Sequence, residues 1–577
     1  MNTKAILSHH LSQRSPRRPA PGEPIQVTLT VPPEIPIHRA WVYYTCDDTD
    51  PDGQLGQARN GSALSMELVG AAWQADKNAY SAVFRAEIPG QPDQTIVRYR
   101  ISGFDDVNGE IWADGGQVYA CLAARQSGPA WAEDAIVYHI FVDRFSPAPG
   151  ESWNTPERLD GFFNGKLRGI TAHLDYIQEL GFNTIYLSPI FPSPSHHGYD
   201  ATNYHDIEPR LGTFEDFTAL LAALHARGMR LMLDFVPDHI SNQHPFFQFA
   251  LSDPENPYRS WFTFENYPDT YRDWMGIEEL PRLNLANPTS RQYIIDAACY
   301  WLEMGVDGLR LDYALGPTPD FWADLRKATQ ALRPDAWLIG EVLAAPDVQL
   351  GFDGLMDGCL DFTLERALRS TFGTRSQSAE SFAAQLQRHL AAFPAWFSRP
   401  LFLDNHDVNR FIWLAGGDVN RLKLAALCQF CLPGQPMVYY GTEVGLSQRQ
   451  GVERPGQTLN FMEESRLPML WGEEQDTDLR MFYTQLIHLR ARTPCLRVGG
   501  LEILFASGGL IAFKRFCEED QLLVVINLSE KAQEINLPGK WQAPLLATNP
   551  GFEFSLQDGE AHFKLPGQTG LACQATI

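Results

Sequence analysis

The stretch GLRLD, residues 308–312, sets Arg310 and Asp312 into an apolar run typical of a strand that is buried on both faces. Charged side chains are almost never fully buried unless they are paired. Three interpretations are open for Asp312: a structural ion pair, a strand end that reaches water, or a functional carboxylate. The neighbouring segments of the chain decide among them.

GLRLD belongs to a series of short apolar runs that alternate with amphipathic, helix-like segments. Helix-like runs include residues 170–181 and 213–228; in the second, Thr213 with Asp216 resembles a capping box and Gly228 marks the end. The strand-like runs are residues 135–141, 184–189, 230–236, 308–312, 337–341, 358–362, 400–407 and 436–443. This rhythm predicts an α/β fold, and the count favours a closed (β/α)8 TIM barrel.

The segments on either side of the barrel have a different pattern. Alternating short strands separated by turns predict a β-sandwich at 23–126 and another at 494–577. Residues 1–22 are expected to form a flexible tail, and the barrel is expected to span 127–493. A long, aromatic, irregular stretch at about 241–283 predicts a subdomain inserted after the third barrel strand.

Composition limits the class of partner. The net charge of −24 argues against binding to nucleic acid and does not favour an anionic membrane surface. The sequence contains no run of about 18 apolar residues, and its N-terminus lacks the apolar segment of a secretory signal. Its nine cysteines are scattered rather than arranged as a disulfide framework. We therefore expect a cytoplasmic protein with a neutral substrate.

Acids and histidines stand at the ends of several predicted barrel strands. Because the carboxyl ends of barrel strands meet at one mouth, these side chains should converge on one pocket. They are Asp234, Asp238, His239, Arg310, Asp312, Glu341, His406 and Asp407. Clustered carboxylates repel one another and destabilise a fold, so a purely structural explanation is disfavoured. Two uses remain: glycoside cleavage by paired carboxyls, and a metal site, which the charge of Arg310 opposes.

Four ordered stretches carry a resemblance to a known family. DFVPDH (234–239), GLRLD (308–312), GEV (340–342) and FLDNHD (402–407) are similar to the signature stretches of the α-amylase superfamily, glycoside hydrolase family 13. Further similar stretches are IVYHIFVDRF (136–145), residues 162–182, residues 196–217, LPRLNLANP (280–288) and RLPMLW (466–471). The order of these matches over about residues 130–577 makes the resemblance specific.

The resemblance implies a role for each site residue. Asp312 would be the nucleophile, Glu341 the general acid and then base, and Asp407 the residue that holds the sugar in a distorted state. Arg310 would orient Asp312 and keep it ionised, while Asp234 would support Arg310. The substrate-binding set implied by the resemblance is Tyr199, Asp200, His239, Arg310, His406 and Arg410. The reaction would retain the anomeric configuration, with the carboxyls of Asp312 and Glu341 about 5–5.5 Å apart.

Some positions depart from the family pattern. Many starch-cleaving members carry Lys-His shortly after the nucleophile, where this chain has Tyr313-Ala314-Leu315-Gly316-Pro317 and lacks that pair. Many relatives have an Asn at the position of Asp238, and that Asn often binds calcium. The segment 143–154 lacks the dense Asp/Asn loop of another calcium site. No cofactor is therefore expected to be required, and calcium is left open.

The domain order resembles that of the cyclomaltodextrinase, neopullulanase and maltogenic amylase group. That resemblance implies a retaining α-glucan hydrolase for maltodextrins or cyclodextrins, and allows a homodimer formed through the N-terminal domain. A transglycosylase or sugar isomerase on the same scaffold is the alternative, because the covalent intermediate is common to both. Trp41 and Tyr43 are expected to be sandwich core, with a dimer or glucan contact as the alternative. The complete set of acids disfavours a non-catalytic glucan-binding module.

Overall fold

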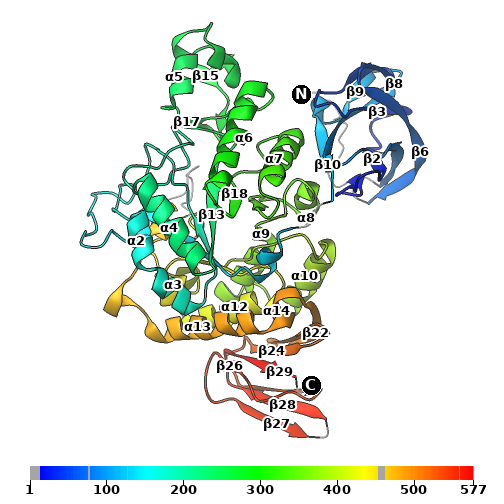
Figure 1. Cartoon of the computed structure of the whole chain (residues 1–577). Coiled ribbons are helices and arrows are strands. Elements are labelled where there is room, and N and C mark those ends of the chain that lie inside the picture. Colours follow the sequence, from blue (N-terminus) through cyan, green and yellow to red (C-terminus); the bar gives the residue numbers. More distant parts are fainter. Residues whose placement is uncertain (1–12, 76–77, 126–127, 453–461, 558, 576–577) are drawn as a thin grey trace.

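The computed structural model describes residues 13–75, 78–125, 128–452, 462–557 and 559–575. A central barrel lies between a β domain near the N-terminus and a second β domain near the C-terminus (Figure 1). The N-terminal domain lies beside helices α7 (Pro319–Leu332) and α8 (Pro346–Gln349), and the C-terminal domain lies below α12 (Val419–Cys431).

The barrel is built from parallel strands in the order β20-β19-β18-β13-β12-β11-β21. The first five in chain order are almost entirely buried, which explains their continuous apolar sequences. The strands are β11 (Val137–Ile140), β12 (Thr184–Leu187), β13 (Arg230–Phe235), β18 (Gly308–Leu311), β19 (Trp337–Gly340), β20 (Gly358–Cys359) and β21 (Met437–Tyr439). The predicted (β/α)8 barrel is confirmed.

The predicted strand at 400–407 is wrong in its extent. The barrel closes through residues 398–401, where Ser398 bridges Gly358 and Leu401 bridges Pro436 in parallel. Pro400 has no N–H to donate, so a regular ladder cannot run through it. Residues 402–407 leave the sheet and turn towards the mouth of the barrel.

Helices cover the barrel, and their ends follow local sequence rules. The predicted capping box of α4 (Phe214–Ala226) is confirmed. The Thr213 hydroxyl accepts from the N–H of Asp216, and the Asp216 carboxylate accepts from the N–H of Thr213. Gly228 adopts a positive φ of 71°, which suits a glycine after a helix. The other longer helices are α3 (Leu174–Leu180), α6 (Pro288–Glu303), α9 (Phe362–Leu368), α10 (Ala379–Ala392) and α13 (Thr477–Arg492).

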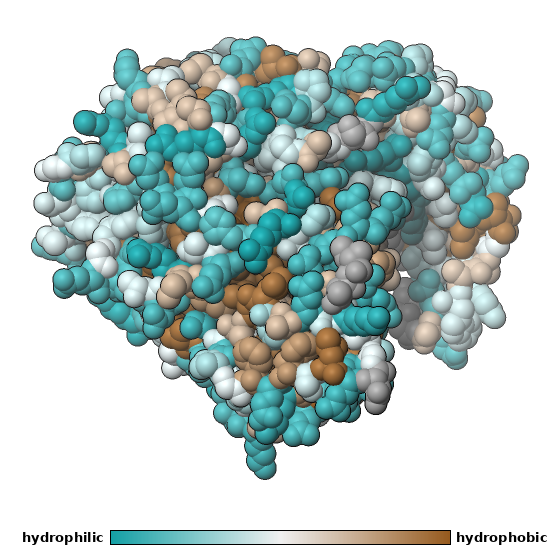
Figure 2. All heavy atoms as spheres, turned by 60° about the horizontal axis from the view of Figure 1, so that its bottom comes forward, coloured by the Kyte–Doolittle hydropathy of each residue, from teal (hydrophilic) through white to brown (hydrophobic). Residues whose placement is uncertain are grey.

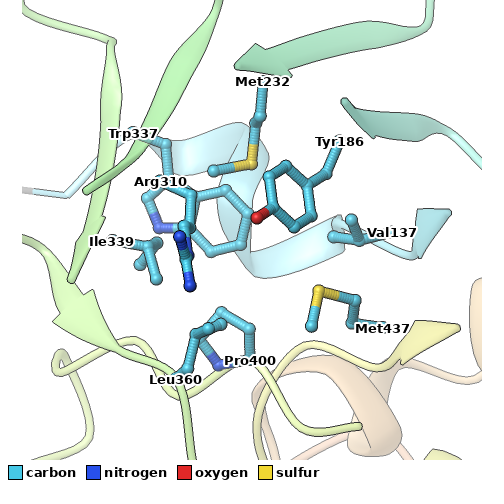
Figure 3. Close-up of a pocket in the computed structure, with 9 residues that line it drawn as sticks. All are labelled: Val137, Tyr186, Met232, Arg310, Trp337, Ile339, Leu360, Pro400 and Met437. Carbon is cyan, nitrogen blue, oxygen red and sulfur yellow. The ribbon is translucent and has the colours of Figure 1, made fainter. Parts of the chain in front are cut away.

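The barrel interior is apolar below the mouth. Side chains from successive strands point inwards and line a small pocket (Figure 3): Val137, Tyr186, Met232, Arg310, Trp337, Ile339, Leu360, Pro400 and Met437. Arg310 is the single cation in this lining, and its guanidinium must find its partners above the apolar layer. The charged residues of the barrel interior therefore lie above this apolar layer, towards the carboxyl ends of the strands.

The segment between β13 and β18 projects away from the barrel at the top of Figure 1. It contains α5 (Pro245–Ser252) and the short strands β14 (Phe264–Asn266), β15 (Thr270–Tyr271), β16 (Asp273–Trp274) and β17 (Ile277–Pro281). The backbone of this segment returns to the barrel mouth, where Arg282 pairs with His239 in an antiparallel bridge. The insertion therefore forms one wall of that mouth.

The N-terminal β domain forms a sheet in the order β1-β2-β7-β6-β3-β8-β10, with β9 beside β8. Tyr43 is fully buried, and its hydroxyl donates to Glu110, so it belongs to the domain core. The strands are β1 (Arg14–Ser15), β2 (Ile25–Val31), β3 (Arg39–Thr45), β6 (Ser62–Gln74), β7 (Ala79–Ile88), β8 (Thr95–Asp105), β9 (Gly109–Trp112) and β10 (Tyr119–Ala123).

The expected tail at 1–22 is corrected in its second half, while residues 1–12 lie outside the described residues. Arg14 pairs with Val27 in the sheet, and its buried guanidinium donates to the carbonyl of Ala120. A polar, Pro/Arg-rich composition favours a tail, but the bond to a distant carbonyl is a tertiary contact that local composition does not reveal.

The C-terminal β domain has two sheets, in the orders β22-β23-β24-β29-β26 and β25-β28-β27. Its strands are β22 (Gly500–Ser507), β23 (Leu510–Phe516), β24 (Gln521–Asn527), β25 (Gln533–Pro538), β26 (Leu546–Ala547), β27 (Glu553–Gln557), β28 (Glu560–Leu565) and β29 (Thr569–Gln574). The face in Figure 2 is mainly hydrophilic, with a patch of apolar residues in its lower middle part. Among the described residues, no helix has the length and apolar character needed to cross a membrane.

Candidate active site

The acids expected at the site lie at the carboxyl ends of neighbouring barrel strands. Asp234 is the second-last residue of β13, Asp312 follows β18 directly, and Glu341 follows β19 directly. His406 and Asp407 lie in the turn that follows the barrel-closing segment, before α11 (Phe411–Leu414). Strand register brings Asp234 opposite Arg310, so the ion pair follows from the pairing of β13 with β18.

Arg310 is the centre of this site. Its Nη1 donates to Oδ1 of Asp234 at 2.8 Å and to Oδ1 of Asp312 at 2.6 Å. Its Nη2 lies 2.6 Å from Oε1 of Glu341. The guanidinium is buried, so these charges attract one another without much screening by water. One cation therefore gathers three carboxyl groups from three strands.

Burial dominates the ionisation of the acids. It raises the pKa of Asp312 well above its ordinary value and raises the pKa of Glu341 as well, while Arg310 opposes both shifts. Three carboxylates facing one guanidinium would leave excess negative charge in a buried place, which favours retention of a proton in the group. The site can thus hold an ionised and a protonated carboxyl side by side.

Asp234 accepts hydrogen bonds from the hydroxyls of two tyrosines. The hydroxyl of Tyr199 donates to its Oδ2 at 2.8 Å, and the hydroxyl of Tyr186 donates to the same atom. The Tyr199 hydroxyl oxygen also lies 2.6 Å from Nε2 of His406, and the two rings are stacked. Burial lowers the pKa of His406 well below its ordinary value, so this ring is neutral.

Asp407 faces the acids from the other side of the mouth. Its Oδ2 lies 3.1 Å from Nε2 of His406, and its Oδ1 accepts from Nη2 of Arg466 at 3.1 Å. The Asp407 side chain is 31% exposed, unlike the buried acids around Arg310. Arg466 also donates to the carbonyl of His406, so it fixes both residues of the pair. No role was predicted for Arg466, although it begins the stretch RLPMLW (466–471) that carries part of the family resemblance.

Comparisons with known proteins identify the family of the chain. Residues 139–485 match the model of the alpha amylase catalytic domain. The chain belongs to the alpha-amylase family. It is 38% identical over 419 residues to alpha-amylase 2 of Dictyoglomus thermophilum, covering 72% of this chain and 73% of that one. It is 33% identical over 443 residues to a cyclomaltodextrinase of Geobacillus thermopakistaniensis, covering 72% and 73%.

The resemblance to a solved structure extends over both β domains. A structure described as cyclomaltodextrinase superimposes with a TM-score of 0.71 at 26% identity, covering 100% of each chain. The chain is thus a glycoside hydrolase of the alpha-amylase family with the domain architecture of the cyclomaltodextrinase group.

Two histidines in this alpha-amylase family site have no hydrogen bond at either ring nitrogen within the described residues. Both nitrogens of His239 are buried without a hydrogen-bond partner, beside the ring of Trp274. Such orphaned polar atoms suit a sugar hydroxyl. His139 of β11 has the same character, stacks on Tyr186 and lies deeper in the barrel. Sequence reasoning missed His139, and its only signal was a polar residue inside an apolar strand.

Asp200 and Arg410 do not sit like the other members of the expected substrate-binding set. Asp200 accepts from the hydroxyls of Ser193 and Ser195, so its Oδ1 anchors its own loop. Arg410 is fully buried, and it donates to the backbone carbonyls of Ser465 and Tyr440. These bonds favour a structural role for Arg410, but its Nη2 has no partner among the described residues, so the substrate-binding role stays a prediction.

This difference between Arg410 and His239 yields a test. We expect Arg410→Leu to lower the melting temperature of the enzyme, because it leaves buried carbonyls unpaired, at about 1–3 kcal/mol for each lost partner. His239→Ala should leave the melting temperature nearly unchanged and reduce kcat/KM on a maltooligosaccharide. Calorimetry and steady-state kinetics measure both effects. A raised KM with an unchanged melting temperature in Arg410→Leu would contradict the structural role.

Proposed function

We propose that the chain is a retaining α-glucan hydrolase that cleaves short and cyclic maltodextrins in the cytoplasm. The observation that carries the proposal is the contact of one buried guanidinium with the carboxyls of both Asp312 and Glu341. Two carboxyls held on one guanidinium suit the separation of about 5–5.5 Å at which retaining glycosidases work. The names of the relatives, which include a cyclomaltodextrinase, support the substrate class. The homodimer stays a prediction.

In the proposed first step, an ionised Asp312 oxygen attacks the anomeric carbon of the bound sugar. The bond from that carbon to the glycosidic oxygen breaks, and Glu341 gives its proton to the departing oxygen. The short bond from Arg310 orients Asp312 for this attack and favours its charged form. Asp407, fixed by Arg466 and His406, accepts hydrogen bonds from the sugar hydroxyls that strengthen as the ring distorts.

In the second step, Glu341 acts as a base on an incoming hydroxyl. It takes the proton, the oxygen attacks the anomeric carbon, and Asp312 departs with its electron pair. The N–H of Tyr313 donates to Oε2 of Glu341 at 3.0 Å and holds the carboxyl in place for both steps. Two inversions at the same carbon give retention.

The acceptor in the second step is water in a hydrolase and a sugar in a transglycosylase or isomerase. Leu315 and Leu343, which follow the nucleophile and the acid, are 41% and 51% exposed. The family resemblance implies that these positions face the leaving sugar, and apolar side chains there would favour contact with a sugar face over ordered water. This observation keeps the transferase as the alternative function.

A product time course distinguishes the two functions. We expect maltotriose and β-cyclodextrin to be cleaved rapidly to maltose and glucose, with soluble starch and pullulan slower. Chromatography of the products measures this, and NMR at early times should show the α-anomer as the first product. Products longer than maltotriose, or isomerised disaccharides, would show transfer to a sugar.

Variants of the two carboxyls separate their roles. Asp312→Asn should abolish turnover of every substrate, because no covalent intermediate forms. Glu341→Gln should lower kcat/KM on maltotriose by about 10²–10⁴-fold, the usual contribution of a general acid. With α-glucosyl fluoride, whose leaving group needs no proton, Glu341→Gln should still form the intermediate. Equal losses on both substrates would contradict the acid role of Glu341.

The pH dependence follows from the direction of the pKa shifts. Burial raises the pKa values of Asp312 and Glu341, and the two carboxyls share one proton in the active state. Activity should therefore fall as the pH decreases and the pair takes up a second proton, and fall again as the pH rises and the pair loses the shared proton. A bell-shaped profile of kcat/KM is expected.

Arg310 lowers both pKa values, so Arg310→Met should move the acidic limb of the profile to higher pH. Arg310→Lys keeps the charge and should move it less. An acidic limb that stays in place in Arg310→Met would show that Arg310 does not govern the ionisation of Asp312.

A further inference from the structure

Asp238 stands where the family resemblance allows a calcium ligand, but another cation already holds it. The carboxylate of Asp238 is buried. Nε of Arg282 lies 2.9 Å from its Oδ2, and Nη2 of Arg282 lies 2.8 Å from its Oδ1. This is the fork-to-fork arrangement in which arginine binds a carboxylate most strongly. Both oxygens of Asp238 are therefore engaged.

The residues around Asp238 do not fit calcium. Calcium takes six to eight oxygen ligands at about 2.3–2.6 Å, and an ion there would face the positive charge of Arg282. Within the ranges that the structure describes, no three His, Cys, Asp or Glu side chains group together so as to hold a metal. The segment 143–154, where the family has another calcium site, does not fit calcium either. Its Asp143 pairs with Arg144 at 2.8 Å and accepts from backbone N–H groups.

Arg282 also binds the loop that follows the nucleophile. Its Nη2 donates to the carbonyl of Gly316 at 3.1 Å as well as to Asp238. A Cβ at position 316 would lie 2.1 Å from Oδ1 of Asp238, so only glycine allows this approach. The missing side chain at Gly316 makes room for the ion pair.

The loop between Asp312 and Gly316 is held in an unusual conformation. Tyr313 has a positive φ of 42°, a backbone conformation that is strained for a tyrosine and needs support from its surroundings. The N–H of Gly316 donates to the Tyr313 carbonyl at 2.8 Å, and Arg282 lies over the Tyr313 ring at 5.9 Å. The N–H of Tyr313 in turn holds Glu341. Arg282 thus supports the loop that positions both catalytic carboxyls.

The same arginine lies next to the sugar-binding histidine. The backbone of Arg282 bridges that of His239, and the N–H of Leu283 donates to the carbonyl of Asp238 at 2.8 Å. The segment after β13, the return of the insertion and the loop after β18 therefore meet at one ion pair. In a metal-dependent protein, one bound cation would hold such a junction together.

We propose that the guanidinium of Arg282 is a built-in cation that takes the place of calcium at this junction. Arg282 is a positioning residue: it holds the loop of Asp312 and Glu341 without touching the substrate. The protein is then independent of calcium. Only the effect on turnover rests on the proposed function, since the junction itself is a property of the fold.

The first measurement compares melting temperatures after treatment with EDTA and after addition of millimolar calcium chloride. Wild-type protein should melt at the same temperature in both. Arg282→Ala leaves the buried carboxylate of Asp238 without its counter-charge, so it should melt several degrees lower in EDTA. Calcium should restore part of that loss and bind to the variant by calorimetric titration, with no corresponding heat in the wild type.

Three further variants complete the design. Arg272→Ala, an exposed arginine of the same insertion, should behave as the wild type. Asp238→Ala combined with Arg282→Ala should lose the calcium response, because no carboxylate remains to bind the ion. Arg282→Lys should melt between the wild type and Arg282→Ala, since it keeps the charge but not the fork. On maltotriose, Arg282→Ala should lose about 10–100-fold in kcat with a smaller change in KM.

Several results would overturn the proposal. A wild-type melting temperature that falls in EDTA and returns with calcium would show that the protein needs the ion. A wild-type melting temperature in Arg282→Ala would show that the ion pair holds nothing, and a loss that calcium does not restore would show that Arg282 does not replace a cation. These readouts need no substrate, so they stand apart from any failure of the proposed glucan hydrolysis.

Discussion

A single buried guanidinium, that of Arg310, is the constraint on which the site depends. Removing an arginine from water costs several kcal/mol, and the barrel interior beneath it offers only apolar side chains and one tyrosine hydroxyl in the pocket lining. The cost is offset by Asp234, Asp312 and Glu341, which come from three adjacent strands. The parallel register of β13, β18 and β19 is what delivers those carboxyls to one point. The chemistry and the sheet order are therefore one arrangement.

The surplus of acids over bases at this point has a consequence for reactivity. One positive charge cannot balance three carboxylates in a buried place, so the group retains a proton that it would lose in water. Burial raises the pKa of Asp234 as well, but Tyr186 and Tyr199 donate to this carboxyl, and their bonds favour its charged form. Asp312 and Glu341 lack such tyrosine donors, so the retained proton is best placed on that pair. The excess of acid thus supplies the division of labour that glycoside cleavage requires.

Much of the fold and part of the site could be predicted from the sequence, and the reason is geometric. A strand such as GLRLD fixes both its own burial and the side on which its last residue emerges, so the acids at strand ends could be placed without a structure. Strand 400–407 and the tail could not be delimited, because Pro400 and Arg14 are governed by partners far away in the chain. The contacts of Arg410 could not be predicted for the same reason: it donates to the carbonyls of Tyr440 and Ser465, about 30 and 55 positions further on.

Arg282 and Arg310 solve the same electrostatic problem at two depths. Each is a guanidinium with a fixed fork, and each binds an acid from the segment of β13 together with a group from the segment of β18. Arg310 joins them inside the barrel and Arg282 joins them at its rim. Because the guanidinium is covalently part of the chain, the junction forms without binding a free ion. Its stability therefore does not depend on the concentration of such an ion. The nucleophile loop is thereby fixed at both of its ends, which makes the left-handed turn at Tyr313 tolerable and keeps Asp312 and Glu341 in register.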